Sequence, residues 1–311
     1  MNARSDFGAQ TTTDEVLDGI ELGGRHFMIT GATSGLGAES ARALAAHGAT
    51  VTMLGRDDKK LEAAQARVRE QVPDADLRSG KVDLADLGSV RAFAGDYLDS
   101  GESIDVLINN AGVMACPQGS TKDGFEMQFG TNHVGHFLLT NLLLPALQQG
   151  DEPRIVNLSS GAHGMSDFQL ADPNFEQTDY DPWIAYGSSK TANVLFTREL
   201  ARRHDGQILA LAVHPGIIET ELARHLPEGA LEQFRDRMKT VQAGAATQTW
   251  AATGPELAAH SGSYLADCGV GVIGAPTEQN GVHEYAYDAD NARELWGLSE
   301  RLVEQSFERS A

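Results

Sequence analysis

The sequence predicts an α/β fold built on one doubly wound parallel sheet with helices on both faces. Short apolar runs alternate with helical patterns along the chain, which is typical of a parallel sheet covered on both sides. The first apolar run leads directly into a glycine-rich turn and then a helix. No linker divides the 311 residues, so we expect a single domain.

The apolar runs are the predicted strands, and their content of Val, Ile and Leu suits strands buried on both faces. They cover 26–30, 50–54, 76–82, 104–109, 154–159 and 208–213, of which 76–82 is the weakest. A short apolar segment at 263–265 predicts a final strand. The predicted helices cover 36–47, 57–71, 86–99, 123–148, 183–204 and 289–307.

Three segments lie outside this alternation. Residues 1–22 are polar and aperiodic, so we expect a loosely docked extension before a domain over 23–311. Segment 161–183 carries apolar and aromatic side chains among acids, and it predicts a substrate loop that forms one wall of a cleft. Segment 215–243 is amphipathic and bordered by Pro and Gly, which predicts a mobile helical flap beside that cleft.

Composition excludes several functional classes. Lys plus Arg is 24 against 44 for Asp plus Glu, a net charge of -20, so we expect no nucleic-acid partner. Cys116 and Cys268 form no disulfide framework and no metal-ligand spacing, which fits a reducing compartment. The N-terminus lacks the apolar core of a signal peptide, and the apolar run 137–147 is too short to cross a bilayer. We therefore expect a cytoplasmic protein with no membrane anchor and no bound metal.

The glycine-rich turn comprises Gly31, Gly35 and Gly37, between the first strand and the following helix. Glycines let the backbone approach a pyrophosphate, and the helix N-terminus presents free N–H groups and a positive dipole end. The turn therefore predicts a dinucleotide site. The alternative is a turn that is glycine-rich for packing alone.

The end of the second strand bears on which dinucleotide is bound. An acidic residue there binds a ribose 2′-hydroxyl, whereas an arginine suits a 2′-phosphate. Gly55 stands where the acid is expected and Arg56 follows it. A planar bidentate cation fits a phosphate well, so NADP(H) is favoured. In the alternative, Arg56 pairs with Asp57, Asp58 or another surface acid, and the cofactor is NAD(H).

The chemistry is indicated by Tyr186 and Lys190, with Ser160 upstream. Tyr and Lys four residues apart share one face of a helix. An ammonium beside a phenol favours the phenolate, so we expect Lys190 to lower the pKa of Tyr186 towards neutrality. Such a phenol is a proton donor and acceptor at working pH, and with a dinucleotide it predicts an alcohol–carbonyl oxidoreductase. The alternative is an exposed helix pair.

An ordered set of motifs resembles the short-chain dehydrogenase/reductase superfamily over roughly residues 25–270. Longer stretches, among them NHVGHFLLTNLLLP, YGSSKTANVLFTREL and SGSYLADC, resemble its retinol dehydrogenase branch, whose relatives include hydroxysteroid dehydrogenases and protochlorophyllide reductases. The resemblance implies a single-domain Rossmann fold. The motifs are TGATSGLG (30–37), VDL (82–84), NNAG (109–112), Asn132 within FGTNHVGHF, NLSS (157–160), YGSSK (186–190) and HPG (214–216).

The resemblance also implies catalytic roles. Ser160, rather than Ser159, holds the substrate oxygen, and Tyr186 transfers the proton. Lys190 stabilises the phenolate and holds the nicotinamide ribose. Asn132 anchors a water that links Lys190 to solvent.

For the cofactor, the resemblance implies that Asp83 contacts the adenine and that Asn109 and Ala111 contact the adenosine ribose side. The segment 215–220 closes over the nicotinamide, with Thr220 bonded to it. The full expected set is Gly31, Thr33, Ser34, Gly35, Leu36, Gly37, Arg56, Asp83, Leu84, Asn109, Ala111, Gly112, Tyr186, Lys190, Pro215, Gly216, Ile218 and Thr220.

The histidines add no metal site, because no carboxylate or cysteine joins them at ligand spacing. We interpret His133 and His136 as packed or surface residues, and His214, before the 215–216 turn, as structural. His163 either borders the substrate site or is also structural.

The apolar loop and flap favour a lipophilic alcohol, ketone or aldehyde, such as a steroid, a retinoid or an aromatic carbonyl compound. A non-catalytic dinucleotide-sensing regulator and a sugar-nucleotide epimerase are the alternatives. Helices 123–148 and 183–204 are where family members commonly form dimers, so we expect a homo-oligomer, a dimer or a tetramer. Their apolar residues Val134, Phe137, Val194 and Phe196 fit either an interface or the core.

Overall fold

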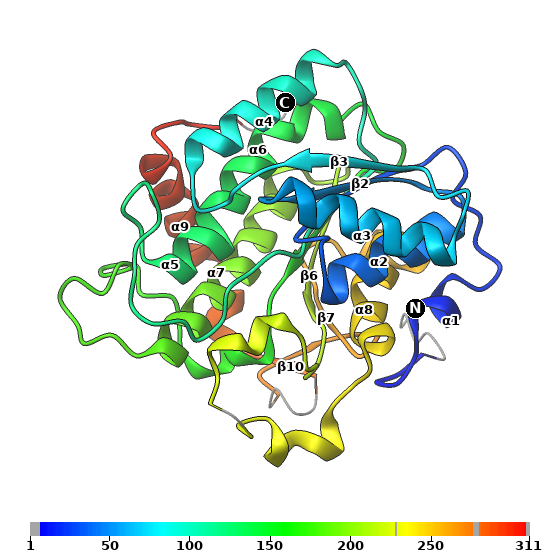
Figure 1. The fold of residues 1–311 in the computed structure, drawn as a ribbon. Helices are drawn as coiled ribbons and strands as arrows, with labels where there is room; N and C mark the ends of the chain where they lie inside the picture. The colour runs from blue at the N-terminus through cyan, green and yellow to red at the C-terminus, as the bar shows by residue number, and fades with distance from the viewer. Residues whose placement is uncertain (1–6, 228, 276–279, 309–311) are drawn as a thin grey trace.

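An eight-stranded sheet lies at the centre of the molecule (Figure 1). The computed structural model describes residues 7–227, 229–275 and 280–308, and its strand order is β3-β2-β1-β4-β5-β6-β7-β8. All neighbouring strands are parallel except the antiparallel pair β7 and β8. The predicted doubly wound sheet is confirmed. The strands are β1 (His26–Thr30), β2 (Thr50–Gly55), β3 (Leu77–Lys81), β4 (Val106–Asn109), β5 (Arg154–Leu158), β6 (Leu209–His214), β7 (Tyr264–Ala266) and β8 (Gly269–Val270).

Helices cover both faces of the sheet (Figure 1). One apolar core joins the sheet to α1, α2, α3 and α8, for example through Leu44 and Trp250. The other joins it to α4, α6, α7 and α9, for example through Phe137 and Leu195. The helices are α1 (Thr13–Leu17), α2 (Gly35–Ala46), α3 (Asp58–Gln71), α4 (Leu87–Asp99), α5 (Met127–Phe129), α6 (Gly135–Leu147), α7 (Pro182–Arg203), α8 (Val241–Thr253) and α9 (Ala289–Leu302).

Short elements complete the described chain. A small parallel pair, β9 (Val272–Ile273) with β10 (Gly281–Val282), lies outside the main sheet. The 3₁₀ turns are η2 (Gly161–Met165), η3 (Glu221–His225), η4 (Glu232–Arg237), η5 (Pro255–Ala259) and η7 (Glu284–Tyr287). In the described residues, no helix combines the length and the apolar character that a membrane crossing needs.

The burial of each strand follows its sequence. Every residue of β1, β4 and β5 is buried, which is why these runs read as continuously apolar. Strand β3 lies at the sheet edge and buries only Leu77 among its five residues. An edge strand needs little apolar surface, so the weakness of the 76–82 pattern has a structural cause.

One predicted helix is interrupted, and one observed helix was not predicted. The predicted helix 123–148 begins at Met127 and is interrupted by a π-helical turn, η1 (Gly130–Val134), before α6. Helix α8 was not predicted, and its first residues were assigned to the flap, 215–243. Eleven consecutive α8 residues, from Ala243 to Thr253, are buried, so the helix has no polar face to produce a periodic pattern.

The N-terminal segment is more firmly placed than its polarity predicts. Thr12 caps α1 in a capping box with Glu15, and Val16 and Leu17 are buried against the core. The Thr13 hydroxyl also donates a 2.6 Å hydrogen bond to Glu39 of α2. Residues 1–6 of the predicted extension lie outside the described residues.

The four apolar residues considered for an interface are core residues. Val134, Phe137 and Val194 are fully buried and Phe196 is 2% exposed within the single chain. Phe137 and Phe196 pack on each other and on Trp296 of α9. These side chains therefore cannot contact a partner subunit. They give no argument for the expected oligomer, which stays a prediction.

Candidate active site

Two adjoining cavities open beyond the carboxyl ends of the central parallel strands, where ligands bind in sheets of this kind. The triad cavity, about 460 Å³, is lined by Ser160, Tyr186 and Lys190. The turn cavity, about 540 Å³, is lined by the glycine-rich turn. Leu36, Asn110, Gly112, Thr220 and Leu222 line both, so the two spaces meet.

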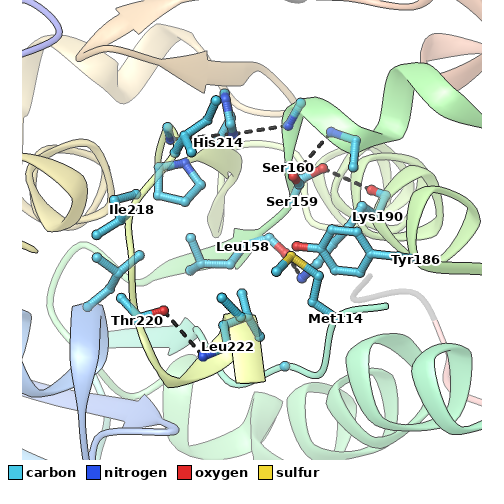
Figure 2. A pocket seen from close by; sticks show the side chains of 18 of the residues that line it. Met114, Leu158, Ser159, Ser160, Tyr186, Lys190, His214, Ile218, Thr220 and Leu222 are labelled. Carbon is cyan, nitrogen blue, oxygen red and sulfur yellow. Dashed lines mark hydrogen bonds between the residues drawn. The ribbon is translucent and has the colours of Figure 1, made fainter. Parts of the chain in front are cut away.

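Ser160, Tyr186 and Lys190 come together in the triad cavity (Figure 2). Ser160 follows β5 and caps η2, where its Oγ accepts the N–H of Ala162 at 3.1 Å. Tyr186 and Lys190 lie one turn apart on α7, and each is 4% exposed. The Lys190 Nζ is 5.7 Å from the centre of the Tyr186 ring. The structure thus brings together the three residues that the sequence proposes.

The two adjacent serines have different environments. The Ser159 hydroxyl is buried and donates to the backbone carbonyl of Lys190 at 2.9 Å. The Ser160 hydroxyl instead lines the triad cavity with Tyr186 and lies near enough to lower the pKa of that phenol. Ser159 therefore fastens β5 to α7, whereas Ser160 is the serine placed beside the phenol.

The ionisation of the Tyr–Lys pair differs from the prediction. Burial raises the pKa of Tyr186 to about 12, and the Ser160 hydroxyl opposes this shift. Lys190 directs its Nζ to the carbonyl oxygen of Leu158, 3.0 Å away, and burial lowers its pKa to about 8. The expectation that Lys190 brings the pKa of Tyr186 towards neutrality is wrong here, because desolvation of the phenol dominates. The phenol therefore keeps its proton at neutral pH.

Asn132 lies in the π-helical turn η1, and its side chain is fully engaged. Its Oδ1 accepts the N–H of Val113 at 2.8 Å, and its Nδ2 donates to the Val113 carbonyl and to Ser189. The Asn132 side chain thus holds the segment after β4 against α7, beside Lys190. The water that the resemblance implies at Asn132 stays a prediction.

His136 connects Asn132 to the first strand. Its Nδ1 lies 3.0 Å from the Asn132 carbonyl, which can only accept, so Nδ1 carries the proton. Its Nε2 then accepts from the Thr30 hydroxyl at 2.9 Å, and the same hydroxyl oxygen accepts the N–H of Ala111. Burial lowers the pKa of His136 to about 4, which keeps this chain of bonds intact at neutral pH. His136 is a packed residue, as the sequence indicated.

The turn after β1 forms a cradle of backbone groups. Gly31 has a φ of +66°, and a Cβ there would lie 2.8 Å from the Cα of Ala111. Gly35 opens α2, and the N-cap residue Ser34 makes no side-chain cap hydrogen bond. The Ser34 hydroxyl donates instead to Glu221 of η3 at 3.2 Å. The first N–H groups of α2 therefore stay available to an anion, and the turn fits the pyrophosphate of a dinucleotide.

The far end of the turn cavity carries positive charge. Arg56 and Lys60 both line it and are exposed. The two acids that follow Arg56 in the sequence have other partners: Asp57 caps α3 at the N–H of Lys60, and Asp58 pairs with Lys81 at 3.1 Å. Within the described residues, Arg56 forms no ion pair, so its guanidinium is free to meet a ligand.

The structure sorts the predicted cofactor residues into three groups. Gly37 and Asn109 line neither cavity: a Cβ at Gly37 would lie 2.6 Å from Nδ2 of Asn110, and the Asn109 amide donates to Thr140 and Asn157 in the interior. Those in the triad cavity are Tyr186, Lys190, Pro215, Gly216 and Ile218. Those in the turn cavity are Gly31, Thr33, Ser34, Gly35, Leu36, Arg56, Asp83, Leu84, Ala111, Gly112 and Thr220, of which Leu36, Gly112 and Thr220 also line the triad cavity.

Some lining residues were missed by sequence reasoning. Lys60 stands in the first turn of the helix after the second strand, and that position is a signal that could have identified it. Glu221 and Arg224 come from a 3₁₀ turn with no periodicity of its own. The missed residues of the turn cavity include Lys60, Asn110, Thr131, Glu221 and Arg224.

Comparison with known proteins settles the family. A family model described as short chain dehydrogenase matches residues 25–230. This chain is a short-chain dehydrogenase. The dehydrogenase is 40% identical over 289 residues to retinol dehydrogenase 13 of Homo sapiens, an alignment that covers 90% of this chain and 85% of that protein. It is 41% identical over 297 residues to retinol dehydrogenase 14 of Mus musculus, covering 90% and 86%.

Solved structures share the fold of this chain. An uncharacterized protein from Mycobacterium paratuberculosis superposes on the dehydrogenase with a TM-score of 0.73 and 39% identity, covering 94% of this chain and 97% of that one. A short chain dehydrogenase from Escherichia coli CFT073, complexed with NADPH, shares the fold with a TM-score of 0.65 and 23% identity, covering 83% and 99%. The predicted retinol dehydrogenase-like branch is confirmed, and the chain is an NAD(P)-dependent dehydrogenase.

Proposed function

We propose that this dehydrogenase interconverts a lipophilic alcohol and its ketone or aldehyde, with Ser160, Tyr186 and Lys190 as the catalytic residues. One observation carries the proposal: a buried phenol, with a serine hydroxyl in the same cavity, lies where an apolar cavity adjoins a dinucleotide cradle. Two buried ionisable groups at the end of a cleft are costly to the fold and are typical of functional sites.

A bound nicotinamide cofactor would supply hydride to the substrate carbon in reduction, or accept it in oxidation. The hydroxyls of Ser160 and Tyr186 hold the substrate oxygen. In reduction, the Tyr186 phenol gives its proton to that oxygen as negative charge develops there. The Lys190 ammonium, 5.7 Å from the phenol ring centre, then stabilises the phenolate that is left. In oxidation, the phenolate oxygen takes the proton back.

The cofactor that the residues favour is NADP(H), with NAD(H) as the alternative. Arg56 is free of an ion pair within the described residues, and Lys60 lines the same end of the turn cavity. Lys60 supplies a second cation that the sequence argument lacked. Two cations around one position suit the two negative charges of a ribose 2′-phosphate better than a neutral hydroxyl.

The substrate is proposed to be lipophilic because of what surrounds the phenol. Trp183 and Met165 are large side chains that stay 37% and 50% exposed, as at the rim of a site that an apolar ligand covers. A steroid, a retinoid or an aromatic carbonyl compound fits this description. The apolar wall comprises Leu36, Met114, Leu158, Met165, Trp183, Ile217, Ile218, Leu222, Ala223, Leu226, Leu231 and Phe234.

The test is oxidation of NADPH and of NADH, followed at 340 nm, with steroid, retinoid and aryl carbonyl compounds. We expect Tyr186→Phe to lower turnover by about 100-fold or more while NADPH binding persists, because general acid catalysis contributes at least about that factor. Tyr97→Phe, which removes a phenol remote from both cavities, is the matched control. Near-normal turnover in Tyr186→Phe would contradict the proposed role of Tyr186 in proton transfer.

The same measurements, together with an assay of a UDP-sugar, separate the alternative functions. A dinucleotide-sensing regulator would bind NADPH without turning over any carbonyl compound. A sugar-nucleotide epimerase would act on a UDP-sugar and retain tightly bound NAD. Cytoplasmic location and a homo-oligomeric state stay predictions.

A further inference from the structure

The triad cavity contains polar side chains that the proposed chemistry does not use. Most of its polar groups already have partners: the Asn110 amide donates to the carbonyl of Thr30, and the Thr220 hydroxyl accepts the N–H of Leu222. Ser159 is bonded to the Lys190 backbone. His214, at the end of β6, and Arg237, at the end of η4, also line the cavity. Unlike the groups above, each has a hydrogen-bond donor without a partner within the described residues.

The hydrogen bonds of His214 fix which ring nitrogen carries its proton. Nδ1 accepts the N–H of Gly161 at 3.0 Å and, more weakly, that of Gly216 at 3.4 Å (Figure 2). Burial lowers the pKa of His214 to about 3, so the ring is neutral. A neutral imidazole that accepts at Nδ1 carries its hydrogen on Nε2. The structure therefore gives His214 a donor at Nε2, and a Cβ built on the cavity residue Gly161 would lie 3.3 Å from that atom.

Arg237 brings a positive charge to the part of the triad cavity that His214 lines. Its side chain is exposed, and within the described residues it forms no ion pair or hydrogen bond. It lies near enough to His214 for its charge to be among the causes that lower the pKa of that ring. The neighbouring cation, Lys239, is paired with Asp267 at 2.5 Å and is neutralised locally. The charge of Arg237 is thus left for a ligand or for solvent.

We infer that His214 and Arg237 form an anion subsite, and that the substrate is an apolar carbonyl compound that also bears a carboxylate away from the reacting carbon. This inference rests on the proposed function and narrows it. A guanidinium matches a carboxylate in shape and charge, and the Nε2–H of His214 supplies a further donor. The apolar body of such a substrate lies against the apolar wall of the triad cavity, between this subsite and Tyr186.

Two matched pairs of aldehydes test the inference: 4-formylbenzoate against 4-methylbenzaldehyde, and 9-oxononanoate against nonanal. In at least one pair we expect kcat/KM for the acid to exceed that for the neutral compound by about ten-fold or more, the worth of one charged hydrogen bond. Arg237→Gln should remove that preference and leave kcat/KM for the neutral aldehyde within about two-fold. Arg235→Gln, on the same 3₁₀ turn but outside the cavity lining, should keep it.

Binding of decanoate and of decan-1-ol, measured by calorimetry, separates the inference from the proposed function. Decanoate affinity that falls about ten-fold in Arg237→Gln, but not in Arg235→Gln, supports the subsite even if no aldehyde is reduced. If no carbonyl compound is turned over, the proposed function is contradicted, but the anion subsite is not. The inference is overturned if Arg237→Gln changes neither decanoate binding nor the ratio of kcat/KM between acid and neutral aldehydes.

His214→Asn tests the imidazole separately. The Asn Oδ1 stands near the position of Nδ1 and can still accept the N–H of Gly161, whereas the Nε2–H is lost. We expect KM for the acid to rise about five-fold or more, with kcat for the neutral aldehyde retained, because one donor to the carboxylate is removed. Equal losses for the acid and the neutral aldehyde would assign His214 a purely structural role and contradict its place in the subsite.

Discussion

Replacing Lys190 by Met should stabilise the protein at neutral pH while it abolishes most of the turnover. Lys190 is 4% exposed, and burial lowers its pKa from 10.5 to about 8. A Met side chain has a similar length and no charge to desolvate. The carbonyl of Leu158, which accepts from Lys190, also accepts from the Asn193 amide at 2.9 Å, so it keeps a partner in the variant.

The size of the effect follows from the pKa shift. A depressed lysine pKa means that the folded state binds its proton less tightly than the unfolded state. Below pH 8 both states are protonated, and the charge of Lys190 lowers the free energy of unfolding by its full amount, about 3 kcal/mol for a pKa that falls from 10.5 to about 8. Between pH 8 and 10.5 the folded state loses its proton first, so the cost falls to about 1 kcal/mol at pH 10. The stabilisation by Lys190→Met should shrink accordingly.

The assay is urea unfolding of the cofactor-free protein at pH 7 and pH 10, with the free energy of unfolding compared between wild type and variant. Lys59→Met, an exposed change on α3, is the control and should alter that free energy by less than about 0.5 kcal/mol at both pH values. A Lys190→Met protein that is less stable than wild type at pH 7, or whose stabilisation does not depend on pH, would refute the argument from burial.

Two further predictions concern the loaded enzyme. Arg56→Ala should weaken NADPH binding by about ten-fold or more and NADH binding by less than about three-fold, since a charged hydrogen bond to the 2′-phosphate is lost; equal losses for both, measured by cofactor fluorescence, would exclude the phosphate role. The rate of carbonyl reduction should fall as pH rises above about 8, because Lys190 loses the charge that stabilises the phenolate while Tyr186, with a pKa of about 12, still holds its proton. A rate that is constant from pH 7 to pH 10 would contradict this.

Most of the fold could be predicted from the sequence because central parallel strands are buried on both faces. Such strands read as short apolar runs, and β1, β4 and β5 were placed within two residues of their observed limits. Helix α8 could not be found in this way, since burial on all sides removes the polar face that makes a helix periodic. The π-helical turn η1 is equally hidden, because one extra residue per turn barely alters an apolar pattern.

The grouping of Ser160, Tyr186 and Lys190 in one cavity could be predicted because the order of the motifs along the chain, and not any single residue, indicates it. The contributions of the flap could not, since Arg224 and Arg237 reach the two cavities from 3₁₀ turns without a sequence pattern. Asn109 is a different case, because its cofactor contact stays a prediction. Its motif places it beside the cofactor, yet its amide is fixed between Thr140 and Asn157 in the interior.

The error about Tyr186 has the most consequence for mechanism. Spacing on a helix tells which side chains are neighbours, but it says nothing about how much water each has lost. Lys190 reaches past the phenol to the Leu158 carbonyl, and both groups are buried, so each shifts towards its neutral form. A phenol that holds its proton at neutral pH is ready to donate it. In the proposed mechanism, the cofactor-free protein therefore favours proton donation to a carbonyl oxygen, and proton removal from the phenol in oxidation would need a further positive charge beside it.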